Sequence, residues 1–337
     1  MNNKDIITLA HGSGGSITQE LISHTFYKHF TNDILLSADD AATLTGIPER
    51  IAFTTDSFVV SPIFFTGGNI GKLSVCGTVN DLTAAGAKAL YLSCGFIVEE
   101  GFKIYDLEKI VISMAQTCSD CGVKIVTGDT KVVQRGAADK IFINTTGIGA
   151  IYEGVNVSGS YAKPGDCVIV SGAIGDHGCS IMIDRNMPGL IGGVSSDCAP
   201  LNKMIEMIYE VTKDIHVLRD PTRGGIATVL NEIAVQSDVA IYLNQGHIPV
   251  NGPVQGACSL LGLEPLYLAN EGKMVIVAPQ RYGKDIVKAL KCDQKGKDAA
   301  IIGYVDEAPK KRVIMKTGAG GSRILDIMSA DQLPRIC

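Results

Sequence analysis

Strand-like and helix-like segments alternate along most of the chain, and this alternation constrains the fold more than any other feature of the sequence. The run 89–98 is apolar and of strand length, whereas residues 104–118 repeat their apolar side chains at helical spacing. Segments of both kinds bury their apolar sides by packing helices on sheets, so we predict an α+β or mixed α/β protein. Hydrophobic residues make up 46% of the chain and charged residues 19%, which is sufficient for a full core.

A break in the alternation predicts two domains. Residues 153–164 contain glycines and a proline but no clear strand or helix pattern. We therefore expect an N-terminal domain over residues 1–155 and a C-terminal α/β domain over residues 156–316. Residues 317–337 begin with a glycine-rich stretch of flexible composition, so we expect a flexible tail that ends in the terminal cysteine.

The same patterns predict the individual elements. Expected helices cover residues 16–26, 71–85, 104–118, 201–211 and 225–234. Expected strands cover residues 34–37, 51–60, 89–98, 123–127, 140–151, 166–171, 239–243, 274–278, 301–305 and 312–316.

Charge and cysteine usage exclude several classes of protein. The net charge is −5 and no Lys/Arg-rich run occurs, so we expect no nucleic-acid partner. The longest apolar stretch is too short to cross a membrane, and the first residues lack a signal-peptide layout. We therefore expect a cytoplasmic protein with no membrane partner, whose ten cysteines are reduced. Cys118 and Cys121 form a lone pair without the further ligands that structural zinc needs.

Aspartates recur where predicted strands end: Asp39 and Asp40, Asp56, Asp81 and Asp129. Carboxylates that converge at strand ends are suited to Mg²⁺, which prefers oxygen ligands and bridges phosphate groups. Neighbouring Gly, Ser and Thr residues let backbone N–H groups approach phosphate oxygens. Each aspartate alone is interpreted as a cap or turn residue. The recurrence leaves a metal–phosphate site and separate local roles evenly balanced.

Two loops offer further contacts for phosphate. Residues 11–15, which include Gly14 and Gly15, precede a predicted helix and form either a phosphate cradle or a flexible loop. They are not a Walker A loop, because no Gly-Lys-Ser/Thr follows. Arg219 and Arg223 flank a proline turn, where they either clamp phosphate or carboxylate groups or lie on a surface turn.

Three side chains are candidates for the chemistry itself. Lys131 follows Asp129 by two residues, so both share a face of a strand, and the lysine either offsets charge on a transferring phosphoryl group or is solvated. Glu271 lies beside a glycine and is either a general base or a turn residue. Cys337 is the last residue, and a mobile terminus can carry its thiol to a distant site. The histidines show no metal-ligand spacing and are interpreted as structural: His11, His177, His216 and His247.

Several of these motifs, in this order and spacing, resemble the signature of one ATP-binding superfamily. It includes aminoimidazole ribonucleotide synthetase, selenophosphate synthetase, thiamine-monophosphate kinase and the HypE hydrogenase maturation proteins. Residues 11–15 and the C-terminal Pro-Arg-Ile-Cys337 resemble the HypE branch. A selenophosphate synthetase needs a reactive cysteine or selenocysteine near its N-terminus, and no cysteine precedes Cys76. The motifs are Asp39-Asp40, Thr55-Asp56-Ser57, Asn80-Asp81, Gly128-Asp129-Thr130-Lys131 and Arg219-Asp-Pro-Thr-Arg-Gly-Gly225.

The resemblance implies a reaction and its partners. A HypF carbamoyltransferase places a carbamoyl group on Cys337, and the chain then dehydrates the thiocarboxamide to a thiocyanate with release of ADP and phosphate. The cyano group passes to iron held by a HypC–HypD complex, for the active site of [NiFe]-hydrogenase. The resemblance also implies a homodimer whose N-terminal domains join through a β-barrel, with ATP at the interface.

The resemblance further assigns roles to residues. It implies ATP and Mg²⁺ as cofactors and Cys337, Lys131 and Glu271 as catalytic residues. The implied metal ligands are Asp39, Asp56, Asp81 and Asp129. The implied nucleotide-binding residues are these four together with Gly14, Gly15, Asp40, Asn80, Gly128, Thr130, Arg219 and Arg223.

Two other functions stay open at this point. One is a different ATP-dependent enzyme of the superfamily that forms a phosphorylated small molecule, for which Cys337 would be dispensable. The other is a non-catalytic scaffold that binds partners through its tail. The dense Asp/Gly motifs argue against the scaffold, because it has no use for a metal–phosphate site.

Overall fold

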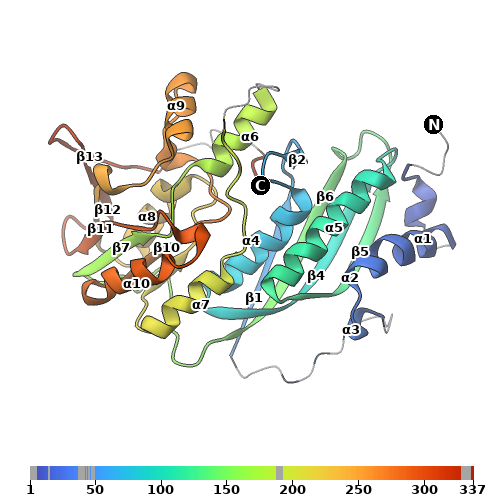
Figure 1. Cartoon of the computed structure of the whole chain (residues 1–337), viewed down its shortest axis with the longest axis horizontal. Coiled ribbons are helices and arrows are strands. Elements are labelled where there is room, and N and C mark those ends of the chain that lie inside the picture. The colour runs from blue at the N-terminus through green and yellow to red at the C-terminus, as the bar shows by residue number, and fades with distance from the viewer. Residues whose placement is uncertain are drawn as a thin grey trace.

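The computed structural model describes residues 6–13, 16–36, 42, 44, 46, 50–186, 193–327 and 335–337. Two large sheets lie side by side, each with its own helices, and the C-terminus lies between them (Figure 1). All strands of the first sheet come from residues 51–151 and all strands of the second from residues 166–324. The predicted mixed α/β fold is confirmed.

The N-terminal sheet has four strands in the order β1, β6, β4, β5. β4 and β5 are parallel, and the other neighbours are antiparallel. Helices α4 and α5 cover one face of this sheet (Figure 1). The bounds are β1 Ile51–Phe58, α4 Ile70–Ala84, β4 Ala87–Glu99, α5 Ile104–Cys121, β5 Lys124–Val133 and β6 Ile141–Ile151. A short ribbon, β2 Phe64–Phe65 with β3 Gly68–Asn69, precedes α4.

Local sequence explains these two helices. The Asn69 side chain caps α4 by accepting hydrogen bonds from the backbone N–H groups of Gly71 and Lys72. In α5, Leu107, Ile110, Val111 and Met114 recur at helical spacing and are fully buried. Helix α5 ends at Gly122, whose φ of 76° is the left-handed conformation that glycine adopts without strain.

Among the described residues, no helix packs on the other face of the N-terminal sheet (Figure 1). Several apolar side chains on it are consequently exposed, and Phe53 is 68% accessible. Ile51 and Ile97 are also exposed on these strands. We call this surface the open face.

The N-terminal helices pack beside β5 and α5. They are α1 Ser16–Leu21, a wider π-helical turn Ile22–Tyr27, α2 Lys28–Phe30 and α3 Asp33–Leu36. The helix predicted over 16–26 is confirmed, but the strand predicted over 34–37 is wrong within the described residues, because 33–36 are helical. The Asn32 side chain explains the difference, since its Oδ1 accepts a hydrogen bond from the Leu35 N–H at 3.0 Å and starts the turn.

The C-terminal sheet has seven strands in the order β13, β12, β9, β11, β7, β10, β8. Helices α7 and α10 pack on one face, and α8 packs on the other. The strand bounds are β7 Asp166–Val170, β8 Val217–Arg219, β9 Ala240–Asn244, β10 Val275–Pro279, β11 Ala300–Asp306, β12 Arg312–Lys316 and β13 Ser322–Ile324. The helix bounds are α6 Asp176–Asn186, α7 Asn202–Val211, α8 Gly225–Gln236, α9 Gly252–Leu261 and α10 Gly283–Leu290. No described helix is both long and apolar enough to cross a membrane.

The flexible tail predicted to begin at residue 317 is wrong for its first part. Residues 317–321 form the turn of a hairpin, closed by a 2.9 Å hydrogen bond from the Thr317 N–H to the Gly321 carbonyl oxygen. β13 then pairs with β12, and Leu325 is 1% exposed in the core. The glycines therefore serve a tight turn rather than a flexible linker.

Candidate functional site

A cavity of about 600 Å³ lies between the two domains. β1 and α4 contribute Asp56 and Asp81 from the N-terminal side. The segment after β8, which includes Arg223, contributes from the C-terminal side, together with Glu271 and Cys337. Cys337 is thus half-buried in the same cavity as two of the predicted aspartates and the predicted base.

Backbone hydrogen bonds hold the last three residues in this position. The Val59 N–H donates to the Cys337 carbonyl oxygen and the Ser61 N–H to the Arg335 carbonyl oxygen, both at 3.2 Å. The Arg335 guanidinium in turn donates to the Val59 carbonyl oxygen at 2.9 Å. Ile336 is only 3% exposed, so its side chain anchors the tail in the N-terminal core.

The thiol of Cys337 lies beside a cationic side chain. Nε of Arg223 lies 3.5 Å from the Cys337 Sγ and donates a hydrogen bond to it. Arg219 also lines the cavity, and its guanidinium is paired with Glu232 at 2.7 Å. Both arginines of the predicted clamp therefore border the cavity, and Arg223 approaches the sulfur itself.

Glu271 is buried in a turn with a fixed backbone. Its N–H donates to Oδ1 of Asp197 at 3.1 Å, and its carbonyl oxygen accepts from the Ala199 N–H at 3.3 Å. Within the part of the chain that the structure describes, the side-chain Oε1 is buried without a hydrogen-bond partner. Burial, and then the neighbouring Cys337 and Cys198, raise the pKa of Glu271 well above its usual range.

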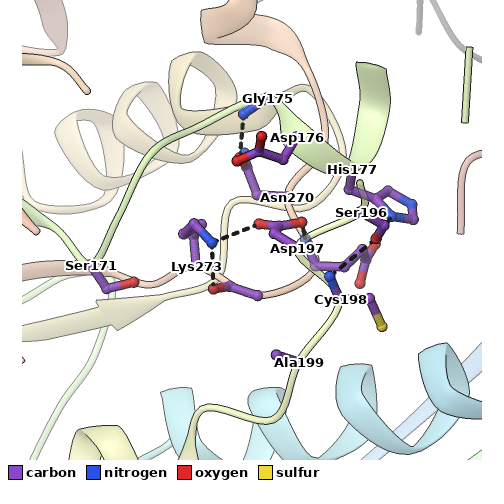
Figure 2. A network of polar contacts seen from close by, with 12 residues as sticks. Ser171, Gly175, Asp176, His177, Ser196, Asp197, Cys198, Ala199, Asn270 and Lys273 are labelled. Atoms are coloured by element: carbon purple, nitrogen blue, oxygen red, sulfur yellow. Dashed lines mark hydrogen bonds and ion pairs between the residues drawn. The ribbon is translucent and has the colours of Figure 1, made fainter. Parts of the chain in front are cut away.

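A buried ion pair supports this turn from behind. Nζ of Lys273 lies 3.3 Å from Oδ2 of Asp197 and also donates to the Gly272 carbonyl oxygen at 3.2 Å (Figure 2). A Cβ on Gly272 would lie 1.9 Å from the Asp197 carbonyl oxygen, so only glycine lets the two segments cross. These contacts therefore hold the backbone that carries the Glu271 carboxyl group in a fixed position.

Asn80, predicted to bind the nucleotide, is placed differently. It is 2% exposed, and its side-chain amide donates to the carbonyl oxygens of Ala199 and Glu271 at 3.1 and 3.3 Å. Its Oδ1 accepts from the Leu201 N–H at 2.9 Å. The side chain thus ties α4 to the Glu271 turn and is not among the residues that line the cavity.

The aspartate carboxyl groups at the cavity have raised pKa values. Burial and then the nearby Asp220 raise the pKa of Asp81 to about 7, against the hydrogen bond from Thr54. Burial also raises the pKa of Asp56 and of Asp220. Asp220 is a site residue that the sequence reasoning missed, although it lies inside the Arg-Asp-Pro-Thr-Arg motif.

These residues are consistent with Mg²⁺ bound together with a phosphate ligand. No group of three or more His, Cys, Asp or Glu side chains within the described ranges is arranged to hold a metal ion by itself. Mg²⁺ commonly takes only one or two carboxylates plus phosphates and water, and the repelling carboxyl groups of Asp56, Asp81 and Asp220 are suited to that role. The predicted residues Asp39 and Asp40 lie outside the described residues.

The predicted Asp129–Lys131 pair lies in a different cavity, of about 280 Å³, on the far edge of the sheet. The two side chains form an ion pair at 3.1 Å and are about two-thirds exposed. Asp129 aligns across the strands with Gly95, Asn144 and Ser57. Asp56 and Asp129 are on opposite edge strands, so one chain does not bring them together.

The other nucleotide-binding predictions are divided between the cavity at β5 and undescribed residues. Gly128 and Thr130 line that cavity together with Gly12. Gly14 and Gly15 lie outside the described residues. A Cβ on Gly12 would lie 2.8 Å from the Val132 backbone nitrogen, so the predicted loop packs closely on β5 there.

Comparison with known proteins identifies the family. Residues 38–151 match the N-terminal domain of AIR synthase related proteins, and residues 163–316 match their C-terminal domain. The chain therefore belongs to the AIR synthase related class of two-domain proteins. Carbamoyl dehydratase HypE of Escherichia coli is 46% identical, with 100% of both chains covered. The chain belongs within that class to the HypE family, as its motifs predicted.

Two solved structures agree with this assignment. A crystal structure of the hydrogenase maturation protein HypE in complex with ATP is 48% identical with a TM-score of 0.94, and 98% of this chain and 99% of that chain are covered. A HypE–HypF complex is 49% identical with a TM-score of 0.80, covering 93% of this chain and 100% of that chain.

Proposed function

We propose that this protein uses ATP to dehydrate a carbamoyl group carried on Cys337, giving an S-cyano group. One observation carries the proposal: the C-terminal thiol lies in the same cavity as Glu271, Asp56 and Asp81. The E. coli relative is named a carbamoyl dehydratase, and a close structural relative was solved with ATP. Both support ATP as the co-substrate here.

The proposed chemistry replaces a poor leaving group by a good one. The thiocarboxamide oxygen takes the γ-phosphoryl group of ATP, which releases ADP. The C–O bond then breaks, phosphate leaves and the C≡N bond forms. Both N–H protons of the amide are lost during this sequence, so a base must lie within hydrogen-bond reach of the amide nitrogen. Glu271 is that base in our proposal, because it is buried next to Cys337 and its raised pKa makes its carboxylate a strong proton acceptor.

The remaining cavity residues bind and orient. Asp56 and Asp81 would hold Mg²⁺, which supplies charge neutralisation for the phosphate groups when bound. Arg219 and Arg223 border the space that a phosphoryl group on the carbamoyl oxygen would occupy, and their guanidinium groups suit its negative charge. The interdomain walls would limit access of water to the phosphorylated intermediate.

We further propose a homodimer in which Lys131 and Asp129 serve the site of the second chain. The open face exposes Phe53, Ile51 and Ile97, which a dimer would cover. Asp129 aligns with Ser57 on that face, while Asp56 points to the other side. The Asp129–Lys131 pair therefore lies on the face that a second copy of the chain would cover.

Complementation between chains tests this arrangement. Lys131→Ala and Glu271→Gln proteins should each be inactive alone, whereas mixed dimers contain one intact site. After random re-association, about one quarter of wild-type dehydration should return. Mixing either variant with itself is the control. No recovery, despite mixed dimers detected by native mass spectrometry, would show that Lys131 acts within its own chain.

We also propose two partners that act on Cys337. HypF would donate the carbamoyl group, as supported by the solved HypE–HypF complex, and a HypC–HypD complex would accept the cyano group. Both need the sulfur outside the cavity, so the tail must alternate between docked and released positions. Hydrogen exchange at residues 335–337 with and without ATP measures this, and equal protection in both states would contradict it.

The decisive experiment is intact-mass analysis of the protein after incubation with HypF, carbamoyl phosphate and ATP. We expect a carbamoyl adduct on Cys337 that loses the mass of water only when ATP is added. Cys337→Ala should acquire no adduct at all. An adduct unchanged by ATP would refute the proposal, as would a phosphorylated small-molecule product formed equally well by Cys337→Ala.

A further inference from the structure

A buried histidine joins the docked tail to the C-terminal domain. Nε2 of His177 lies 2.8 Å from the carbonyl oxygen of Ile336, and Nδ1 lies 2.8 Å from Oγ of Ser196. The ring is fully buried, with the ring of Phe65 packed edge-on at 5.6 Å between centroids. Figure 2 shows His177 at the start of its helix with Ser196 beside it. The sequence alone gave this histidine only a structural role.

The direction of each hydrogen bond follows from the chemistry of the groups. The Ile336 carbonyl oxygen can only accept, so Nε2 of His177 carries a proton and donates it. In the neutral ring Nδ1 then accepts from the Ser196 hydroxyl group, whose oxygen accepts from the Cys198 N–H at 3.1 Å. Burial lowers the pKa of His177, which favours this neutral ring. The whole chain of bonds is satisfied only while the tail is docked.

We propose that His177 is a positioning residue for the carrier tail, whose bond to the Ile336 carbonyl oxygen holds Cys337 beside Glu271. The bonded peptide group is the one directly before Cys337, so its orientation sets the direction in which the thiol projects. When the tail leaves, the Nε2–H loses its partner in a buried place, which disfavours the released state. This proposal rests on the proposed function only in taking Cys337 as the carrier.

A second contact from the same helix supports this role. Arg185, at the other end of α6, donates to the Arg335 carbonyl oxygen at 2.9 Å and to the Ser61 carbonyl oxygen at 3.0 Å. α6 therefore contacts two successive carbonyl groups of the tail. Polar residues of α6 therefore bind the tail, although the weak apolar pattern of this helix gives no sign of that role.

The test measures how often Cys337 is released, without any partner or ATP. Cys292 is exposed and the other eight cysteines are buried, so the Cys292→Ser protein leaves Cys337 as the accessible thiol. Iodoacetamide labelling of Cys337, followed by peptide mass spectrometry, should be roughly threefold to tenfold faster in His177→Phe, since one hydrogen bond is removed. His177→Gln retains an N–H donor and should restore part of the protection.

The matched control is His216→Phe, because His216 binds Asp166 and Asp214 away from the tail. It should label at the wild-type rate. If His177→Phe fails to fold, Ser196→Ala decides instead: it keeps the ring, removes the bond that orients it, and should still accelerate labelling. If His177→Phe folds and its Cys337 is labelled at the wild-type rate, the proposal is overturned. If His177→Phe does not fold, a wild-type labelling rate in Ser196→Ala overturns it. Faster labelling in a protein that shows no dehydration would refute the function and leave the positioning role standing.

Discussion

Glu271→Gln is expected to lower the rate of ATP-dependent dehydration by roughly two to four orders of magnitude, while carbamoylation of Cys337 by HypF continues. The substitution keeps the size of the side chain and removes only the ability to accept a proton. The backbone of residue 271 is held by Asp197 and Ala199, so the turn should not move. Single-turnover dehydration of carbamoylated protein, followed by intact mass, measures the effect.

The pH profile gives an independent signature of the same residue. Only the carboxylate form can act as base, and burial raises the pKa of Glu271, so the active fraction increases as pH rises towards that raised pKa. The wild-type rate should therefore rise with pH until that pKa is passed. Glu271→Gln should lose this dependence.

Glu232→Gln is the matched control, because Glu232 lines the same cavity but is paired with Arg219. Its rate should fall by less than about tenfold, the effect of weakening one partly exposed ion pair. A Glu271→Gln protein that dehydrates at a comparable rate would show that another group is the base. A dehydration rate that still depends on pH in Glu271→Gln would also show that another group is the base.

Local patterns were sufficient to predict most of the sheet and helix framework. α5 shows why: its apolar residues at helical spacing are the ones buried. α6 was missed because its sequence is polar and contains glycine, and its buried face includes His177 and Ser180 rather than an apolar stripe. Residues 34–37 were predicted to be a strand, although 33–36 are helical, because the run is too short for periodicity to decide.

The candidate site was predictable where a motif carried it and not where contacts between distant segments form it. Asp56, Asp81, Glu271 and Cys337 were found individually, and the structure brings them to one cavity. Lys273 and Asp197 are 76 residues apart, and no local pattern signals that they pair. The docking of Cys337 depends on Val59 and His177, both far away in the sequence. Such contacts follow from the packing of two domains.

Asp81→Asn is expected to stabilise the ligand-free protein at pH 8, on the order of 2 kcal/mol in the free energy of unfolding. The pKa of Asp81 is raised from 3.8 to about 7 in the folded state, chiefly by burial. One pKa unit corresponds to about 1.4 kcal/mol, and solvent screening of the partly exposed side chain reduces the total. Asparagine removes the charge and can still accept the hydrogen bond from Thr54.

The sign of this effect depends on pH. Between about pH 4 and pH 7 the folded protein holds a proton on Asp81 that the unfolded chain has released, so this group costs stability progressively as pH rises through that window. The advantage of Asp81→Asn should therefore be greatest above pH 7 and vanish near pH 4. Urea unfolding at pH 4.5, 6 and 8 measures it. Asp120→Asn, at an exposed position on α5, should show no such trend.

The same substitution should nearly abolish binding of Mg²⁺–ATP, because the charge that destabilises the empty cavity is the one that a cation needs. Wild-type affinity should strengthen as pH rises through about 7, when Asp81 loses its proton. Calorimetric titration of ATP with Mg²⁺ at pH 6 and 8 tests both statements. A variant that is less stable than wild type at pH 8, or that binds Mg²⁺–ATP normally, would contradict this account. In this account, the charge of Asp81 lowers the free energy of unfolding of the ligand-free protein, and binding of the metal–nucleotide complex offsets that loss.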